Sequence, residues 1–345
     1  MRKLFFFILL FVGIGLFVFA LYSTDLSEVA RALSKLWPWK FIAVTLILFS
    51  AEILIDAFRW FLILKSQGQD IKFRPPLLAR MVGFSFSYLT PVVLLGGEPV
   101  RYAILKEETN IPSKYIISSI ILDKLILFLA SFVFFLIGVF AFIFYLPTNL
   151  FTKLMISTLV LLLPLSGFFI YLKIRSISLK EGIFSWLMKK FYLKRIKIFK
   201  EKKENIKEIE LEIRKFFTKD KKTLSKIFLM GGIEVFLTIL SFWTIVIFLG
   251  KHLALFKIFA INSMVGLASF FPLPAALGTL EVSQGYLFQF FNLSQTDGVA
   301  FSLIFRGINL LFSCLGILLF LYFQLRILKK KILRFIQEII KFYEK

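Results

Sequence analysis

Two glycines, a glutamate and an arginine lie close together in an otherwise apolar part of the sequence, Gly96-Gly97-Glu98-Pro99-Val100-Arg101. The glycine pair permits an unwound turn, and Pro99 suits the first position of a new helix, which places Arg101 in its first turn. Free amides at a helix start, the positive end of the helix dipole and a guanidinium form an anion site suited to phosphate. We therefore predict that this stretch binds a lipid phosphate. The alternative is that Arg101 only pairs with Glu98 or Asp123 and holds a broken helix together.

A second stretch repeats this arrangement, because Glu281 follows Pro274 by seven residues, as Glu98 follows Pro91. Gly278 loosens the chain, and Thr279 is predicted to cap the helix that follows, with Glu281 in its first turn. A glutamate there interacts favourably with the helix dipole even without a ligand. A structural role for Glu281 and contact with a cationic head group or a proton are equal alternatives.

Further charges interrupt the apolar runs. Glu52, Asp56 and Arg59 are spaced i, i+4 and i+7, so we expect them on one helix face toward the bundle interior. Arg59 lies near a helix end and is expected to extend toward the membrane surface. Charges at Asp123, Lys124, Glu234 and Arg306 are also costly unless paired or hydrated. The predicted head-group residues are Gly96, Gly97, Glu98, Arg101, Asp123, Lys124, Glu281 and Arg306, and the predicted cavity-lining residues are Glu52, Asp56, Arg59 and Thr279.

The elements that position these residues follow from the composition. The chain has 345 residues, of which 59% are hydrophobic and 46 are phenylalanine, which indicates an integral membrane protein. We predict an all-α bundle of about six full spans, each needing about 20 apolar residues, with two re-entrant or broken hairpins. The predicted spans are residues 4–22, 41–64, 116–146, 151–172, 226–249 and 299–325.

Charge sets the predicted orientation. The formal net charge is +22, and residues 173–226 hold 18 Lys and Arg against 7 Asp and Glu. The positive-inside rule places this segment and both termini in the cytoplasm, so the charge indicates topology and not nucleic acid binding. The hairpin at 76–106 then begins and ends inside and the one at 256–292 outside. This is the pattern of inverted repeats, with half-helices meeting near the bilayer midplane.

Three parts follow from this reading: an N-terminal half at 1–172, a basic linker at 173–225 and a C-terminal half at 226–345. The linker contains amphipathic stretches at 177–199 and 206–217. They lie on the membrane surface or are solvated and only set topology.

Enzyme signatures are missing from the sequence. His252 and Cys314 are the single histidine and the single cysteine, which excludes histidine metal sites, thiolate clusters and intrachain disulfides. We expect no catalytic residues, no cofactor and no metal ion.

The first-half residues together resemble a known family. Arg59-Trp60, Pro91, the stretch from Gly96 to Arg101 and Asp123-Lys124 are similar to the second-helix arginine, the P-x-x-x-x-G-G-[DE]-x-x-R core and the later D-R pair of that family. The family is the transmembrane region of bacterial lysylphosphatidylglycerol synthase and flippase proteins, with stand-alone flippase-like relatives. The resemblance implies a lipid-handling membrane protein.

In the second half, Pro274 to Glu281 resembles the family's P-x-G-G-L-G-x-x-E segment, and Arg306 its following helix arginine. The sequence departs from the pattern at three places. Lys124 replaces an arginine, Ala275-Ala276 replace the glycine pair, and Leu280 stands where a basic residue is common. The chain also lacks the aminoacyl-transfer domain of the full-length synthases, so lysylation of lipid by this chain is not expected.

Together, the residues and the resemblance predict a flippase or transporter for a phospholipid or a polyprenyl-phosphate lipid in the cytoplasmic membrane. Arg101 meets the phosphate, with Arg306 as a second cation. The alternatives are a membrane transferase that uses a lipid-phosphate donor and a noncatalytic partner of a separate synthase. The expected partners are membrane phospholipids, including anionic lipid at the cytoplasmic face, and a homo-oligomer or a separate lipid-modifying enzyme is left open.

Overall fold

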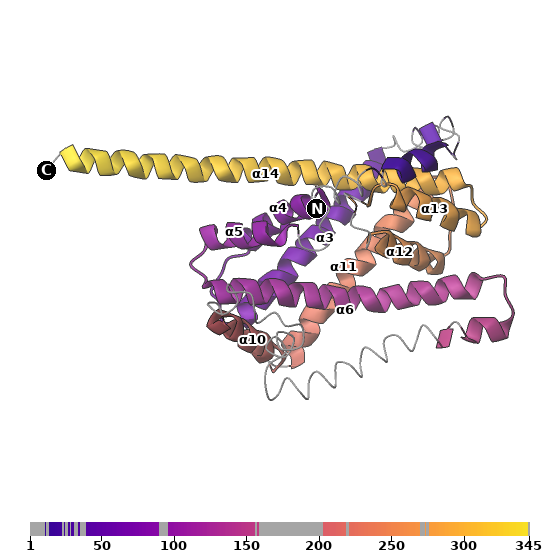
Figure 1. Ribbon diagram of the computed structural model, residues 1–345, viewed down its shortest axis with the longest axis horizontal. Coiled ribbons are helices and arrows are strands. Elements are labelled where there is room, and N and C mark those ends of the chain that lie inside the picture. Colours follow the sequence, from indigo (N-terminus) through magenta and orange to yellow (C-terminus); the bar gives the residue numbers. More distant parts are fainter. Residues whose placement is uncertain are drawn as a thin grey trace.

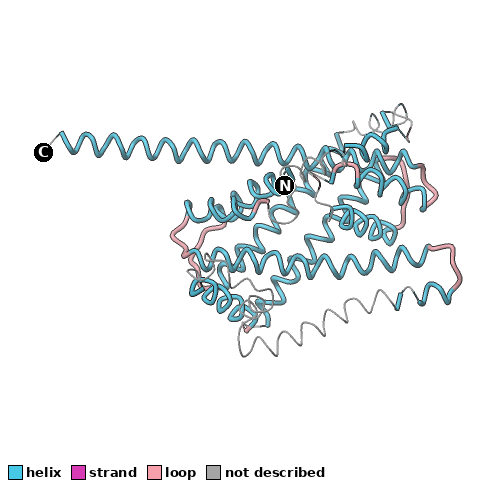
Figure 2. The backbone as a smooth tube through the Cα atoms, in the orientation of Figure 1, coloured by secondary structure: helices cyan, strands magenta, loops and turns pink. Residues whose placement is uncertain are grey.

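A computed structural model shows helices joined by turns throughout the described part of the chain (Figure 1, Figure 2). The described residues are 39–89, 96–155, 157–158, 203–218, 221–269, 273 and 276–343, with scattered positions between 11 and 34.

Four helices are long and apolar enough to cross a membrane, which confirms a polytopic all-α bundle. They match the predicted spans at 41–64, 116–146, 226–249 and 299–325. Of the predicted span at 4–22 the structure describes residues 11 and 14–22, which are helical, whereas the predicted span at 151–172 lies largely outside the described residues. The four are α3 (Trp39–Ser66), α6 (Ser113–Tyr145), α11 (Lys221–Phe248) and the Gln295–Leu328 part of α14 (Gln295–Tyr343).

Shorter helices lie between the long ones, in the same order in both halves. Two of them, α4 (Arg74–Leu89) and α5 (Glu98–Glu108), separate α3 from α6. Likewise α12 (Leu255–Ser269) and α13 (Thr279–Phe290) separate α11 from α14. Pro91 and Pro274, in the connections between the paired short helices, lie outside the described residues. Each half therefore has the order long, short, short, long.

The two halves run in opposite directions. At one end of the α3–α11 pair the rings of Phe41 and Phe248 lie 5.0 Å apart, so the start of α3 meets the end of α11. At the other end, Ile63 and Ile227 belong to one buried cluster, so the end of α3 meets the start of α11. Figure 1 shows that α6 and α14 also run in opposite directions. Equivalent helices that run antiparallel confirm the predicted inverted repeat.

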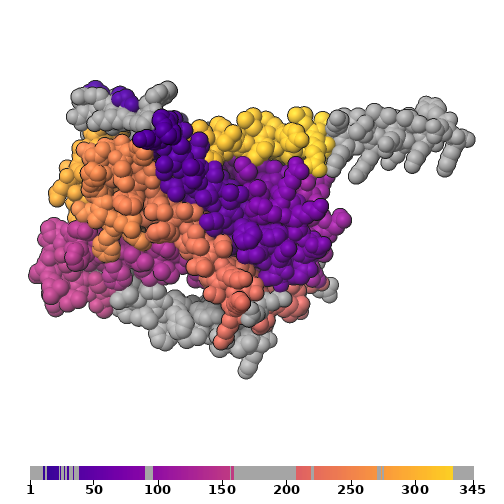
Figure 3. Space-filling model, turned by 180° about the vertical axis from the view of Figure 1, so that it is seen from behind, coloured from indigo at the N-terminus to yellow at the C-terminus, as the bar shows by residue number. Residues whose placement is uncertain are grey.

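Reciprocal packing joins the halves. The first short helix of each half packs on the last long helix of the other, α4 on α14 and α12 on α6. In Figure 3, α3 runs beside the orange helices of the second half, with α14 above them. Contacts exchanged in this way are those of two units related by a twofold axis.

A glycine permits each of these two crossings. A Cβ on Gly138 of α6 would lie 2.1 Å from the Phe259 oxygen and 2.1 Å from the Ser263 Oγ of α12. On α14, a Cβ on Gly316 would lie 2.0 Å from the Ser85 Oγ of α4. Small residues that bring backbones into contact are typical of helix packing in membranes. The same packing arrangement thus occurs once in each half.

The linker contributes one described helix, α10 (Lys203–Phe217), which contains the predicted amphipathic stretch at 206–217. Its Phe216 is buried in a cluster that includes Leu122 and Ile227, so its apolar side packs on protein. On its outer side, a hydrogen bond to Glu212 raises the pKa of Lys215. The other amphipathic stretch, 177–199, lies outside the described residues.

Candidate functional site

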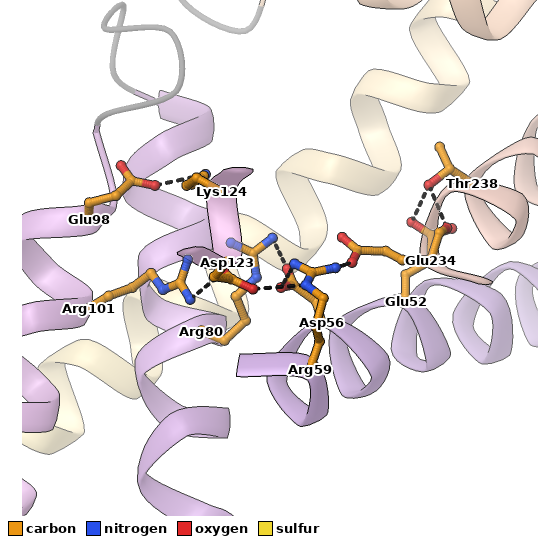
Figure 4. Close-up of polar contacts among 10 residues, drawn as sticks. All are labelled: Glu52, Asp56, Arg59, Arg80, Glu98, Arg101, Asp123, Lys124, Glu234 and Thr238. Carbon is orange, nitrogen blue, oxygen red and sulfur yellow. Dashed lines mark hydrogen bonds and ion pairs between the residues drawn. The ribbon is translucent and has the colours of Figure 1, made fainter. Parts of the chain in front are cut away.

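Five charged residues of the first half and one of the second form a buried group, which is named here the charge cluster. Three arginines face three carboxylates, so the formal charges cancel. They come from five helices, α3, α4, α5, α6 and α11 (Figure 4). The members of the charge cluster are Asp56, Arg59, Arg80, Arg101, Asp123 and Glu234.

Arg59 lies at the centre of the charge cluster. Its Nε donates to Asp123 Oδ1 at 2.9 Å, its Nη2 donates to Asp56 Oδ1 at 2.7 Å, and its Nη1 donates to Glu234. The residue is 0% exposed. The prediction that Arg59 extends to the membrane surface is therefore wrong, because three carboxylates satisfy the guanidinium where it lies. The prediction that Asp56 faces the bundle interior is confirmed, since it is 1% exposed.

Arg101 joins the charge cluster from the first turn of α5. Its Nη2 donates to Asp123 Oδ2 at 2.8 Å, and its guanidinium lies 4.1 Å from the ring centre of Trp60. Its Nε and Nη1 have no hydrogen-bond partner in the described structure, although the residue is 0% exposed. The pairing with Asp123, named above as an alternative to ligand binding, therefore exists. It uses only part of the hydrogen-bonding capacity of Arg101.

Glycines bring Arg101 into this position. A Cβ on Gly97 would lie 2.0 Å from the backbone oxygen of Gly83, so α5 begins in direct contact with α4. A Cβ on Gly83 would lie 2.5 Å from the Cγ of Arg101, so that glycine leaves room for the arginine side chain. α5 begins at Glu98, one residue before the predicted Pro99, and Gly96 precedes the N-cap Gly97. The predicted break and helix start are thus present.

A second ion pair lies beside the charge cluster. Lys124 Nζ is 2.8 Å from Glu98 Oε1, which connects α6 to the first residue of α5. Their side chains are 26% and 11% exposed, against 2% or less for the pair formed by Arg101 and Asp123. Glu98–Lys124 is therefore the part of this polar region nearest to the surroundings of the protein.

The equivalent place in the second half holds one ion pair. Arg306 of α14 donates to Glu281 Oε1 from Nε at 3.0 Å and from Nη2 at 2.6 Å. Glu281 Oε2 accepts the backbone N–H of Gly278 at 2.8 Å, so the glutamate also caps α13. Gly278 has φ +80°, a conformation that favours glycine. The pairing of Glu281 with Arg306 gives the residue a structural role.

Thr279 was predicted to cap α13, and this is wrong. The N-cap is Gly278, and the Thr279 Oγ1 lies 3.1 Å from the backbone oxygen of Ala276 and 3.2 Å from that of Ala268, either of which can accept its hydrogen. A threonine that begins a helix already has helical geometry, so its hydroxyl turns to nearby carbonyl groups instead. Thr279 does line an apolar hollow of about 200 Å³ together with Ser283.

Glu52 lies on α3 and faces α11. Its Oε1 accepts the Ser241 hydroxyl at 2.7 Å, and its Oε2 lies 3.3 Å from the Thr238 Oγ1. This residue faces a neighbouring helix, as predicted, and contacts hydroxyl groups instead of a cation.

Sequence reasoning missed Arg80, which pairs with Asp56. It lies in a basic run after the predicted span at 41–64, and such a run is typical of a loop, whereas α4 already begins at Arg74. Pro75 and Pro76 suit the first turn of a helix and were the signal available for this start.

The fold and the charge cluster define a class of protein: an integral membrane protein of two inverted helical repeats, with ionised side chains buried between them. The chain belongs to the family described as the lysylphosphatidylglycerol synthase transmembrane region, whose pattern matches residues 6–316. A relative is the UPF0104 membrane protein PH1989 of Pyrococcus horikoshii, which is 25% identical over 321 residues, covering 88% of this chain and 92% of the relative.

Proposed function

We propose that this protein moves a phosphate-bearing lipid, a phospholipid or a polyprenyl phosphate, between the leaflets of the cytoplasmic membrane. The observation that carries the proposal is Arg101, which is fully buried while Nε and Nη1 have no partner among the described residues. An unpaired buried donor costs about 1–3 kcal/mol, and a charged one costs more. Phosphate oxygens are the acceptors that a guanidinium binds most strongly, and a bound phosphate would remove this cost.

The surroundings of Arg101 support an anion as ligand. Arg101 lies in the first turn of α5, where backbone amides and the helix dipole favour negative charge. Asp123 accepts hydrogen bonds from both Arg59 and Arg101. Arg101 can therefore turn to a phosphate while Arg59 still neutralises Asp123.

Entry begins at the more exposed end of the polar region. The Lys124 ammonium is the first cation that a head group meets, because its side chain is 26% exposed. In the conformation described here Arg101 is enclosed, so the head group reaches it when the start of α5 moves away from α4. The acyl or prenyl tails stay in lipid throughout, which avoids transferring the bare phosphate into hydrocarbon.

The family supports a lipid as the cargo, since its name refers to a synthase of a modified phospholipid. In this proposal both termini lie in the cytoplasm. Lipid gradients, the membrane potential or protons supply the driving force. The rival functions are a transferase with a lipid-phosphate donor and a noncatalytic partner of a separate synthase.

Reconstitution into liposomes tests the proposal. Fluorescent phosphatidylglycerol, phosphatidylethanolamine and a polyprenyl phosphate are placed in turn in the inner leaflet, and their arrival in the outer leaflet is measured by reductant quenching. We expect the wild-type protein to accelerate at least one of them and Arg101→Met to lose most of that acceleration. Arg101→Lys keeps the positive charge but loses the planar guanidinium with its paired N–H donors, so its lipid transport rate should be intermediate.

Arg74→Gln is the matched control, because it removes an exposed arginine from the start of α4 and should leave transport unchanged. Size-exclusion profiles establish that each variant is folded. Equal rates for Arg101→Met and the wild type would refute the assigned site. A covalently altered lipid in the same vesicles would favour the transferase, and absence of transport for all three lipids would favour the noncatalytic partner.

A further inference from the structure

Glu52 is a carboxylate without a cationic partner in the middle of the described bundle. It projects from α3 toward α11 and contacts the hydroxyls of Ser241 and Thr238. Among the ion pairs of the described residues none includes Glu52, whereas the three acids of the charge cluster all pair with arginine. An ionised carboxylate in hydrocarbon without a cation is strongly disfavoured, and the usual response is to take up a proton.

The number of hydrogens available for the contacts of Thr238 also favours a protonated Glu52. Thr238 Oγ1 lies 3.3 Å from Glu52 Oε2 and 3.2 Å from the backbone oxygen of Glu234, and both are acceptors if Glu52 is ionised. A hydroxyl has one hydrogen and cannot donate fully to both. If Glu52 carries a proton, its O–H donates to Thr238, and Thr238 donates to the oxygen of Glu234. Both contacts of Thr238 can carry a hydrogen only when the acid is protonated.

We infer that Glu52 is a proton-binding site, and that its proton binds in concert with the lipid phosphate. This inference rests in part on the proposed transport function. Glu52 is half-buried while Asp56, one turn further along α3, is 1% exposed, so protons reach Glu52 more readily than the charge cluster. Figure 4 shows Glu52 and Thr238 at one end of the polar groups and Glu98 with Lys124 at the other.

Charge balance explains why proton and phosphate would bind together. The charge cluster is formally neutral, so a phosphate arriving at Arg101 makes the region negative. A protonated Glu52 adds no further negative charge, whereas an ionised one repels the phosphate. Each ligand then raises the affinity for the other by the same factor, as linkage requires. Proton uptake at Glu52 thereby favours the lipid-loaded state.

Other charged and titratable groups on the surrounding helices can be separated from this effect, since each has a partner of its own. These groups are Asp56 and Arg59 of α3, Arg80 and Tyr88 of α4, Asp123 and Lys124 of α6, Glu234 of α11, Lys257 of α12 and Arg306 of α14.

Dicyclohexylcarbodiimide tests the proton site directly, because a protonated carboxylic acid in an apolar setting adds across the carbodiimide and rearranges to a stable N-acylurea. The purified full-length protein is treated over a pH series, and the modified peptide is quantified by mass spectrometry. We expect modification at Glu52 that falls about tenfold for each pH unit above its midpoint. Glu52→Gln should remove the adduct.

Glu281 is the internal control, since it is 0% exposed and paired with Arg306, and it should remain unmodified. Thr238→Val and Ser241→Ala remove the hydroxyl partners without altering a charge. They should shift the midpoint while leaving Glu52 reactive. A Glu52 that stays unmodified at acidic pH, or equal modification of Glu281, would overturn the assignment.

The coupling is tested in the liposomes. The wild-type transport rate should fall as pH rises through the Glu52 midpoint, and Glu52→Gln should transport at a rate that does not change over this range. If no lipid moves in any vesicle, the transport function fails while the carbodiimide result still decides the proton site. If lipid moves with the same pH profile in the wild type and Glu52→Gln, the coupling is refuted and the transport function stands.

Discussion

The two halves of this protein share a scaffold but not a polar interior. Both have the same helix order and the same glycine crossing, Gly138 against α12 and Gly316 against α4. In the first half, five charges from four helices form one neutral network together with Glu234 of α11. In the second half, Glu281 and Arg306 form a single pair backed by the cap at Gly278. The backbone symmetry therefore does not require symmetric chemistry.

The difference indicates where a ligand is expected. Within the described residues, Arg306 directs two donors to Glu281, and Glu281 is held further by a backbone amide. Arg101 makes one hydrogen bond, and two of its nitrogens, Nε and Nη1, have no partner there. A pair fixed in this way suits a structural role, while an arginine with spare donors suits a ligand. We therefore assign a structural role to the Glu281–Arg306 pair of the second half and ligand binding to Arg101 of the first half.

The largest expected effect comes from replacing the central arginine of each site by methionine. Arg59→Met leaves three buried carboxylates with too few cations. We expect the free energy of unfolding to fall by about 3–5 kcal/mol, or the protein not to fold. Arg306→Met removes the cation beside Glu281, which keeps its hydrogen bond to Gly278, so the loss of unfolding free energy should be smaller. Thermal unfolding in detergent, followed by tryptophan fluorescence, measures both.

Arg214→Met on the outer side of α10 is the control, since its side chain is 42% exposed and its pair with Glu210 lies along the helix surface. Exposed pairs of this kind contribute about 0–1 kcal/mol. Equal losses for Arg59→Met and Arg306→Met would show that the number of partners does not determine the stability of the two sites.

The next effect tests the symmetry of the scaffold. Gly138→Ala and Gly316→Ala each place a methyl group against the opposing helix, so both should destabilise by about 1–3 kcal/mol. Gly266→Ala on α12 has no atom within 4 Å of the new Cβ and should be neutral or slightly stabilising, because alanine favours helix. Unfolding curves of the three variants and the wild type measure these changes in stability. A large loss for one crossing and none for the other would indicate that only one half depends on close packing.

The spans and the break points were predictable from the sequence because they depend on local properties. About 20 apolar residues are needed to cross a bilayer, and the predicted runs at 41–64 and 116–146 lie within a few residues of α3 and α6. The helix start at Glu98 followed from the glycine pair and Pro99, whose backbone preferences act within a few residues.

The partners of the buried charges were not predictable, because they depend on which helices meet. Arg59 bonds to Asp123 and Glu234, which are 64 and 175 residues away. Its position near a helix end favoured the membrane surface, and tertiary packing overrode that tendency. Arg80 was missed because a basic run after α3 is typical of a loop, and only its contact with Asp56 shows its role. The assignment of head-group contacts stays a prediction.

The smallest expected difference separates the two glutamates at the helix starts. Glu281→Gln weakens a pair in which the acid is fully buried and also holds the Gly278 amide, so we expect a loss of about 2 kcal/mol. Glu98→Gln weakens a pair whose lysine is 26% exposed, so solvent compensates and the loss should stay below about 1 kcal/mol. The two unfolding midpoints in the same detergent measure the difference. If Glu98→Gln were the more damaging change, Glu98 would be the structural member and the assignment of roles to the two halves would have to be reversed.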